Sequence, residues 1–209
     1  MKKIIFFLAL CVACAGARPM TRIDGLHISD GGSGGVPVVF LHGLGSDLTA
    51  WRGQLDHLRA TRRAIAFDLR GHGESEPAKD GVYTVDKLTG DLEAVVSQLG
   101  LTRFWLVGHS MSGAVLSTYA GRHPEKLAGL IYIDAVGDMT TTPSEIREYF
   151  RKHDAGLTPP QLQETYGEML APRAKPGTRK EVLATAARMD LRAFGNCARR
   201  CRKCPGRSS

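Results

Sequence analysis

Short apolar runs recur along the first two thirds of the chain, separated by stretches of helical spacing. Four runs have the length and composition of buried strands, namely Val36–Leu41, Ala64–Phe67, Phe104–Val107 and Leu127–Ile133. Thr21–Ser29 is expected to form a first strand before them, followed by a glycine-rich turn at Asp30–Gly35. Apolar strands that alternate with helices predict an α/β fold, with a mostly parallel sheet flanked by helices.

The predicted helices of this part lie between the strands. Val85–Leu99 places six apolar residues on one helical face, Val85, Leu88, Leu92, Val95, Val96 and Leu99. Trp51–Leu58 predicts a shorter amphipathic helix. The small residues that begin at Ala114 predict a helix that runs to about His123, just before a proline.

The pattern changes after Asp138, where short helices follow one another without apolar strands. A threonine followed by a proline is a favourable helix start, because threonine caps the first turn and proline needs no amide there. Thr142-Pro143 opens a helix to about His153, and Thr158-Pro159 opens a second. Thr178–Met189 is expected to form a third.

One strand and the helix after it meet at the sequence Gly108-His109-Ser110-Met111-Ser112-Gly113. A strand that ends in a serine and turns at once into a helix is the nucleophile elbow, G-x-S-x-G. The tight turn requires a strained backbone at Ser110 and small neighbours. Ser112 stands where the pattern has its second glycine, so we expect the turn to be kept at a cost in packing. Because the motif is short, a chance glycine- and serine-rich turn is the alternative.

Composition is that of an ordinary globular protein, and 209 residues suffice for one domain with a substantial core. The formal net charge is +7. The excess positive charge lies at the two ends of the chain. It comes from Lys2 and Lys3 and from the basic residues after Asp190, among which there is no acidic residue. The body between them is close to neutral, so no basic face and no nucleic-acid partner are expected.

Residues 1–17 have the organisation of a secretory signal peptide. Two lysines precede the apolar run Ile4–Val12, and the small residues Ala15-Gly16-Ala17 predict cleavage after Ala17. The protein is therefore expected to be exported, either to a periplasm or into the medium, with a lipoprotein anchored through Cys14 as the alternative. The apolar run is shorter than the roughly 20 residues of a transmembrane helix, so no stable membrane span is expected.

Three motifs occur in order along the body of the chain, VVFLHGLG at 38–45, FDLRGHGES at 67–75 and LVGHSMSG at 106–113. With them, the stretch Val36–Asp138 resembles the α/β-hydrolase superfamily, in its single-domain branch of serine esterases, lipases and peroxidase-like enzymes. The resemblance implies a hydrolase core over residues 18–138 and a helical cap, or lid, over residues 139–190. Helices that pack on the sheet without acting as a lid are the alternative.

The same resemblance implies roles for residues at the carboxyl ends of the strands. Ser110 would be the nucleophile, and the backbone amides of Leu44 and Met111 would form the oxyanion hole. Asp134 directly follows its strand, where some members of the superfamily carry the acid of the catalytic triad, and Asp138 is a nearby rival. Capping the strand or bonding the amides of the loop is an equally good role for Asp134.

Several other polar residues of the motifs are interpreted as structural. His42, His72 and His109 match family positions that shape loops. Arg70 and Asp68 are expected to brace the loop after their strand.

The triad histidine that the resemblance implies has no evident counterpart. Family members supply it late, after the last strand, but residues 191–209 contain neither a histidine nor a strand-like run. This basic stretch carries three cysteines, Cys197, Cys201 and Cys204, and is typical of a truncated or frame-shifted end. The cysteines lack a fourth metal ligand, so no metal and no cofactor are predicted. His153 is the remaining candidate base, and we do not expect it to serve.

These observations predict a serine hydrolase that cleaves carboxylic esters or related small acyl substrates through an acyl-enzyme at Ser110. The alternative is a truncated, catalytically inactive homologue that lacks the triad histidine. A nucleophilic aspartate, as in epoxide hydrolases and haloalkane dehalogenases, is disfavoured because serine occupies the elbow. A small acyl molecule is the expected partner. Leu127–Ile133 would form an unprotected apolar sheet edge, which predicts self-association.

Overall fold

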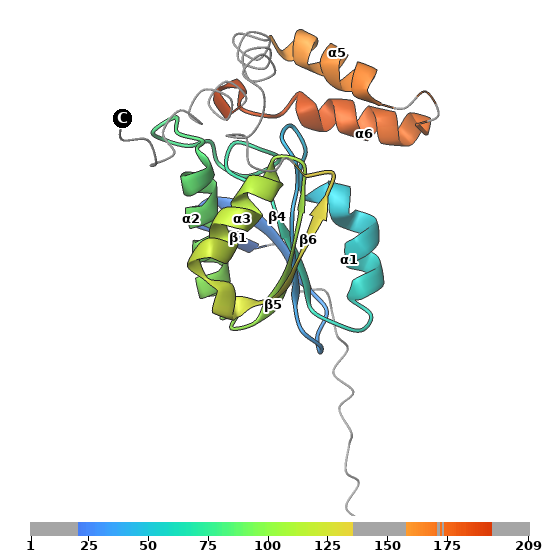
Figure 1. The fold of residues 1–209 in the computed structure, drawn as a ribbon. Helices are drawn as coiled ribbons and strands as arrows, with labels where there is room; N and C mark the ends of the chain where they lie inside the picture. The colour runs from blue at the N-terminus through green and yellow to red at the C-terminus, as the bar shows by residue number, and fades with distance from the viewer. Residues whose placement is uncertain (1–20, 136–157, 171, 173, 194–209) are drawn as a thin grey trace, which may run out of the picture.

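The computed structural model describes residues 21–135, 158–170, 172 and 174–193. Within this part, six strands form one sheet in the order β1-β2-β4-β3-β5-β6 (Figure 1). They are β1 (Thr21–Ile23), β2 (Leu26–Gly31), β3 (Val38–Leu41), β4 (Ala64–Phe67), β5 (Phe104–His109) and β6 (Leu127–Ile133). β3 pairs in parallel with β4 and β5, and β5 pairs in parallel with β6. The expected mostly parallel sheet is confirmed.

The N-terminal strand differs from the expectation of one strand over Thr21–Ser29. Asp24 and Gly25 both have positive φ, +49° and +82°, and turn the chain back so that β1 pairs antiparallel with β2. Asp-Gly is a favoured pair for such a two-residue hairpin, and this signal is present in the sequence. β2 then continues through Asp30 and Gly31, which were expected in a turn, because they pair with Ile65 and Ala64 of β4. Arg63 also bonds both oxygens of the Asp30 carboxylate, at 2.9 and 2.7 Å.

Helices cover both faces of the sheet, α2 and α3 on one and α1 on the other (Figure 1). The elements are η1 (Leu48–Trp51), α1 (Arg52–Leu58), α2 (Val85–Gln98), α3 (Ser112–Arg122) and η2 (Pro124–Lys126). The predicted face of α2 is buried at Leu88, Leu92, Val95 and Val96. On the opposite face, Trp51 packs on Phe40 with ring centroids 5.0 Å apart.

β6 forms the outer edge of the sheet in the described part of the chain. Three apolar residues at its carboxyl end are strongly exposed, Ile131 at 43%, Tyr132 at 47% and Ile133 at 41%. Nearer its start, Gly129 pairs with Trp105 of β5, and a Cβ at Gly129 would overlap the indole ring. The ring therefore covers the glycine, while the apolar end of the strand faces solvent.

Two helices of the predicted cap, α5 (Pro159–Met169) and α6 (Pro176–Ala186), lie beyond the carboxyl ends of the parallel strands (Figure 1). α5 begins where Thr158 predicts, and the Thr158 amide donates to Gln161 Oε1 at 2.9 Å. α6 begins at Pro176, before the expected Thr178, because proline is tolerated in the first turn of a helix. It ends at Ala186, before the expected Met189. No described helix has the length and apolarity needed to cross a bilayer. The expected helix over residues 142–153 lies outside the described residues.

Candidate active site

Ser110 occupies a sharp corner between β5 and α3. Its φ is +51°, in the left-handed region that residues with a Cβ rarely adopt, as the elbow motif predicts. β5 ends at the preceding residue, and α3 begins two residues later. The amide of Gly113 closes the corner by donating to the Ser110 carbonyl oxygen at 3.0 Å. The side chain is only partly buried, so solvent reaches the corner.

Small residues allow β5 and α3 to approach each other. A Cβ at Gly108 would lie 2.5 Å from Leu116 Cδ1 and 3.2 Å from Ser112 Cβ. Ser112 was expected to cost packing, but the structure shows a different role. Its side chain is fully buried, and its hydroxyl donates to the carbonyl oxygen of His42 at 2.5 Å. This bond ties the first turn of α3 to the loop after β3.

The loop after β3 passes directly beside the serine. A Cβ at Gly43 would lie 3.1 Å from the Cβ of Ser110 and 2.8 Å from His109 Nδ1, so only glycine fits there. The Ser46 amide donates to the Gly43 carbonyl oxygen at 3.2 Å, which closes a four-residue turn. Gly45 has a φ of +68°, whereas Leu44 has no positive φ. This combination is a type II turn, and it leaves the Leu44 amide outside the hydrogen bond that closes the turn.

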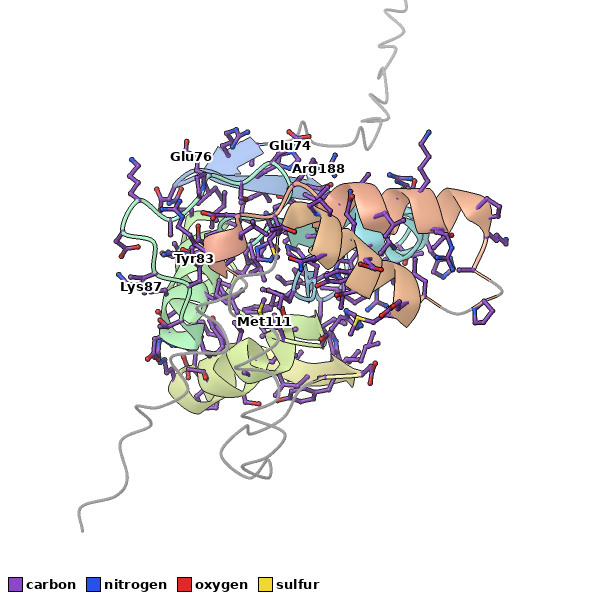
Figure 2. The ribbon with its side chains drawn as sticks, turned by 90° about the horizontal axis from the view of Figure 1, so that it is seen from above. Glu74, Glu76, Tyr83, Lys87, Met111 and Arg188 are labelled. Carbon is purple, nitrogen blue, oxygen red and sulfur yellow. The ribbon has the colours of Figure 1, made fainter. Side chains whose placement is uncertain are left out.

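Leu44 follows Gly43, which lies beside Ser110, and Met111 follows Ser110 itself; the amides of these two residues are the predicted oxyanion hole. Met111 is buried and precedes the first residue of α3, so its amide belongs to the positive end of that helix. In the view onto the carboxyl edge of the sheet, Met111 lies near the centre of the molecule, between α3 and the cap helices (Figure 2). That both amides bind one oxyanion remains a prediction.

Buried histidines shape these loops, as expected. His42 is fully buried, its Nδ1 bonds the carbonyl oxygen of Gly43 at 2.7 Å, and its Nε2 accepts from the Leu69 amide at 3.0 Å. Burial lowers the pKa of His42 to about 4. Burial, together with the neighbouring His42, lowers the pKa of His72 to about 3. The two rings lie 5.2 Å apart. Because both pKa values lie well below 7, both rings are neutral parts of the scaffold near pH 7.

The loop after β4 is braced by the two residues that the sequence indicated. Asp68 is buried and accepts from the Leu48 amide at 2.7 Å and the Glu74 amide at 2.9 Å. Arg70 forms two hydrogen bonds to the carboxylate of Asp91, at 2.6 and 2.5 Å. Bidentate pairing of this kind fixes a loop more firmly than a single bond. The structural interpretation of Asp68 and Arg70 is confirmed.

Asp134 follows β6 next to the nucleophile's backbone, since the Ser110 amide donates to the carbonyl oxygen of Ile133 at 3.2 Å. Asp134 is exposed, has a φ of +42°, and bonds no described histidine. Its assignment as the acid stays a prediction, and its rival Asp138 lies outside the described residues. Within the described ranges, the hydroxyl of Ser110 makes no hydrogen bond to a histidine, and no three potential metal ligands are grouped for an ion.

Asp47 was missed by the sequence reasoning. It is 2% exposed and caps η1 by accepting from the Thr49 amide at 2.9 Å. Burial raises the pKa of Asp47, but hydrogen bonds from Thr49 and from Arg188 (2.7 Å) outweigh it and hold the pKa below its usual value. An aspartate before a helical turn is a recognisable cap signal. Its partner Arg188, distant in sequence, has no such signal.

A second missed residue is Tyr166 of α5. Its hydroxyl donates to the carbonyl oxygen of Leu44 at 2.5 Å, and its ring occupies the space where a Cβ of Gly45 would stand. The loop after β3 thus contacts the nucleophile on one side and the cap on the other. Nothing local in the sequence pairs these positions, because the contact is long-range.

The arrangement of a positive-φ serine, a strand–helix corner and an adjacent loop agrees with comparisons to known proteins. The family model described as alpha/beta hydrolase fold matches residues 36–192, which is well over half of the chain. The chain belongs to the alpha/beta hydrolase family. The expected fold class and the expected membership are both confirmed.

Relatives within this family have several activities. Non-heme chloroperoxidase CPO-A1 of Kitasatospora aureofaciens is 44% identical over 106 residues, which is 49% of this chain and 38% of that protein. Epoxide hydrolase 4 of Mus musculus is 34% identical over 133 residues, 63% of this chain and 36% of that protein. The chain thus spans little more than a third of these curated relatives. By family it is grouped with enzymes.

A solved esterase from Thermogutta terrifontis, with malate bound, shares the architecture over a longer stretch. It has a TM-score of 0.69 and 27% sequence identity, covering 86% of this chain and 68% of that one. The fold of this alpha/beta hydrolase is therefore similar to that of a solved esterase over most of the chain.

Proposed function

We propose that this alpha/beta hydrolase cleaves carboxylic esters or related small acyl substrates through an acyl-enzyme on Ser110. The left-handed backbone of Ser110 is the observation that carries the proposal. A non-glycine residue at positive φ is costly, and such strain gathers at functional corners where the side chain must be presented. A serine also separates this chain from hydrolases that use an aspartate nucleophile at the elbow.

The chemistry follows from what surrounds the serine. The Ser110 oxygen attacks the acyl carbonyl, and the oxygen of that carbonyl becomes an anion. In the proposal, the amides of Leu44 and Met111 bind this anion, each contributing about 2.7–4 kcal/mol to the transition state. Loss of the alcohol leaves the acyl-enzyme, and water then releases the acid. The proton of the Ser110 hydroxyl must pass to the departing alcohol through a general base, which is not among the described residues that bond Ser110, and Asp134 is proposed as the acid that orients this base.

A catalytically inactive homologue is the second candidate. The observation that favours it is the Ser110 hydroxyl, which bonds no histidine in the described residues. Without a base to take its proton, the hydroxyl is a weak nucleophile, and only binding and the oxyanion hole would remain. Triads stripped of a member retain about 10³–10⁴-fold over water in enzymes of this type.

A serine-directed fluorophosphonate and a p-nitrophenyl ester distinguish the two candidates. We expect both to react with the chain and not with Ser110→Ala. Ser117→Ala is the matched control, because Ser117 lies exposed on α3 and, among the described residues, bonds the Gly113 carbonyl oxygen and Tyr132 rather than any part of the site. Ester hydrolysis that is equal in the chain and in Ser110→Ala would remove the esterase and leave the inactive homologue.

A further inference from the structure

The cap touches the catalytic region at one turn of the loop after β3. Tyr166 of α5 donates from its hydroxyl to the carbonyl oxygen of Leu44 at 2.5 Å. Its ring packs on Gly45, where a side chain would collide with the hydroxyl and with Cζ. Nearby, Thr185 and Arg188 bond Asp47 at 3.3 and 2.7 Å, so α6 and the residues just after it hold the following segment.

The bonded carbonyl belongs to the central peptide of the type II turn. Type I and type II turns differ by a half-turn of the peptide between their two middle residues, which here are Leu44 and Gly45. Without a partner, this peptide can exchange between the two orientations. The hydroxyl of Tyr166 bonds the carbonyl in one orientation only, and the positive φ of Gly45 belongs to the same orientation.

We propose that Tyr166 is a positioning residue, which anchors Leu44 to α5 through its carbonyl oxygen and thereby holds the Leu44 amide at the oxyanion. The inference rests on the proposed function, because the oxyanion arises in that reaction. The amide and the bonded carbonyl oxygen belong to the same residue, so loss of the bond lets Leu44 and its amide move together as the turn loosens. A cap residue thus acts on the reaction without touching the substrate.

The test compares Tyr166→Phe with Tyr83→Phe in the full chain. Tyr83 is a matched control because its hydroxyl also joins the body to the segment after α6, donating to Asp190 at 2.5 Å and accepting from the Ala78 amide at 2.9 Å rather than bonding the turn. The first readout is hydrogen exchange of the Ser46 amide, whose bond to the Gly43 carbonyl oxygen closes the turn. Loss of one neutral hydrogen bond predicts exchange about three- to tenfold faster in Tyr166→Phe, and an unchanged rate in Tyr83→Phe.

The second readout is hydrolysis of a p-nitrophenyl ester. A misaligned oxyanion donor lowers kcat and leaves KM unchanged, and we expect about a three- to tenfold loss in Tyr166→Phe alone. Unchanged Ser46 exchange in Tyr166→Phe, or equal changes in both variants, would overturn the inference. If the unsubstituted chain shows no Ser110-dependent turnover, the proposed function fails, while Ser46 exchange still decides whether Tyr166 controls the turn.

Discussion

A single backbone conformation sets the chemistry and the energetic cost of the site. Ser110 has a φ of +51°, and left-handed backbone costs roughly 1–2 kcal/mol for a residue with a Cβ. The cost is local to this position, since the neighbouring Gly108 and Ser112 fit their surroundings by size and by a buried hydrogen bond. Substitution of the reactive Ser110 and substitution of the packing residues Gly108 and Ser112 should therefore change the stability of the protein in different ways.

Replacing the nucleophile by glycine should stabilise the protein relative to replacing it by alanine. Ser110→Gly and Ser110→Ala both lack the hydroxyl and differ only in the Cβ that the positive φ disfavours. We expect the glycine variant to be more stable by about 1 kcal/mol in urea unfolding. Equal stability of the two variants would contradict a strained corner.

Two glycines around α3 should respond in opposite directions to alanine. At Gly108 the new Cβ meets Leu116, so we expect a loss of about 1–3 kcal/mol. Gly121 is exposed on α3 with no atom within 4 Å of a new Cβ, so alanine should add about 0.5–1 kcal/mol there. Urea unfolding of the two variants measures both, and a destabilised Gly121→Ala would count against the described surroundings.

At the scale of elements, the sequence predicts the strands and helices that are marked by a local pattern of apolar residues. β4 and β6 fall at their predicted bounds, and the predicted face of α2 is buried, because apolar periodicity reports burial directly. The hairpin at Asp24-Gly25 was predictable from its turn residues but was hidden by the continuous run around it. The contact of Tyr166 with Leu44 was not predictable, because it depends on how a distant helix docks. Likewise, the elbow at Ser110 is evident from the sequence, whereas the placement of the loop after β3 beside it follows only from the fold.

The outer edge of β6 should cause the protein to self-associate. Ile131, Tyr132 and Ile133 expose apolar surface on the strand that forms the edge of the sheet among the described residues, which favours pairing with a second copy. We expect the sedimentation coefficient to rise with concentration for the full chain and not for Ile131→Lys. Val36→Lys is the control, because Val36 is similarly exposed away from β6. Monomers at all concentrations, or an equal effect of both lysines, would refute association through this edge.

The molecule as a whole carries a pH dependence from its buried histidines. His42 and His72 have pKa values of about 4 and about 3 when folded, below their ordinary 6.5. Below pH 6.5 the unfolded chain therefore binds protons that the folded chain does not, so stability falls as the pH is lowered. The slope for each histidine approaches about 1.4 kcal/mol per pH unit.

Urea unfolding between pH 7.5 and pH 5 tests this dependence. This pH range lies above the pKa values of ordinary carboxylates. His72→Asn should roughly halve the contribution, while His57→Asn, on the exposed side of α1, should leave it unchanged. A stability that stays flat from pH 6.5 to pH 5 would mean that the two rings are not buried as neutral groups.

The location of the protein is a further proposal at this scale. We propose that residues 1–17 direct export, and we expect a chain expressed with them in a Gram-negative host to begin at Arg18 by intact mass. Ala17→Arg should block the cleavage. A product that carries lipid, and loses it in Cys14→Ser, would replace free export with membrane anchoring.

The stacking of Trp105 on Gly129 has a practical consequence for spectroscopy. The chain contains two tryptophans, and the other, Trp51, is buried on the opposite side of the sheet from α2 and α3, against Phe40. In Trp51→Phe, the tryptophan fluorescence would come from Trp105 of β5, whose indole covers Gly129 of β6, the edge strand of the described sheet. Detachment of β6 would then be visible in real time as a change of emission.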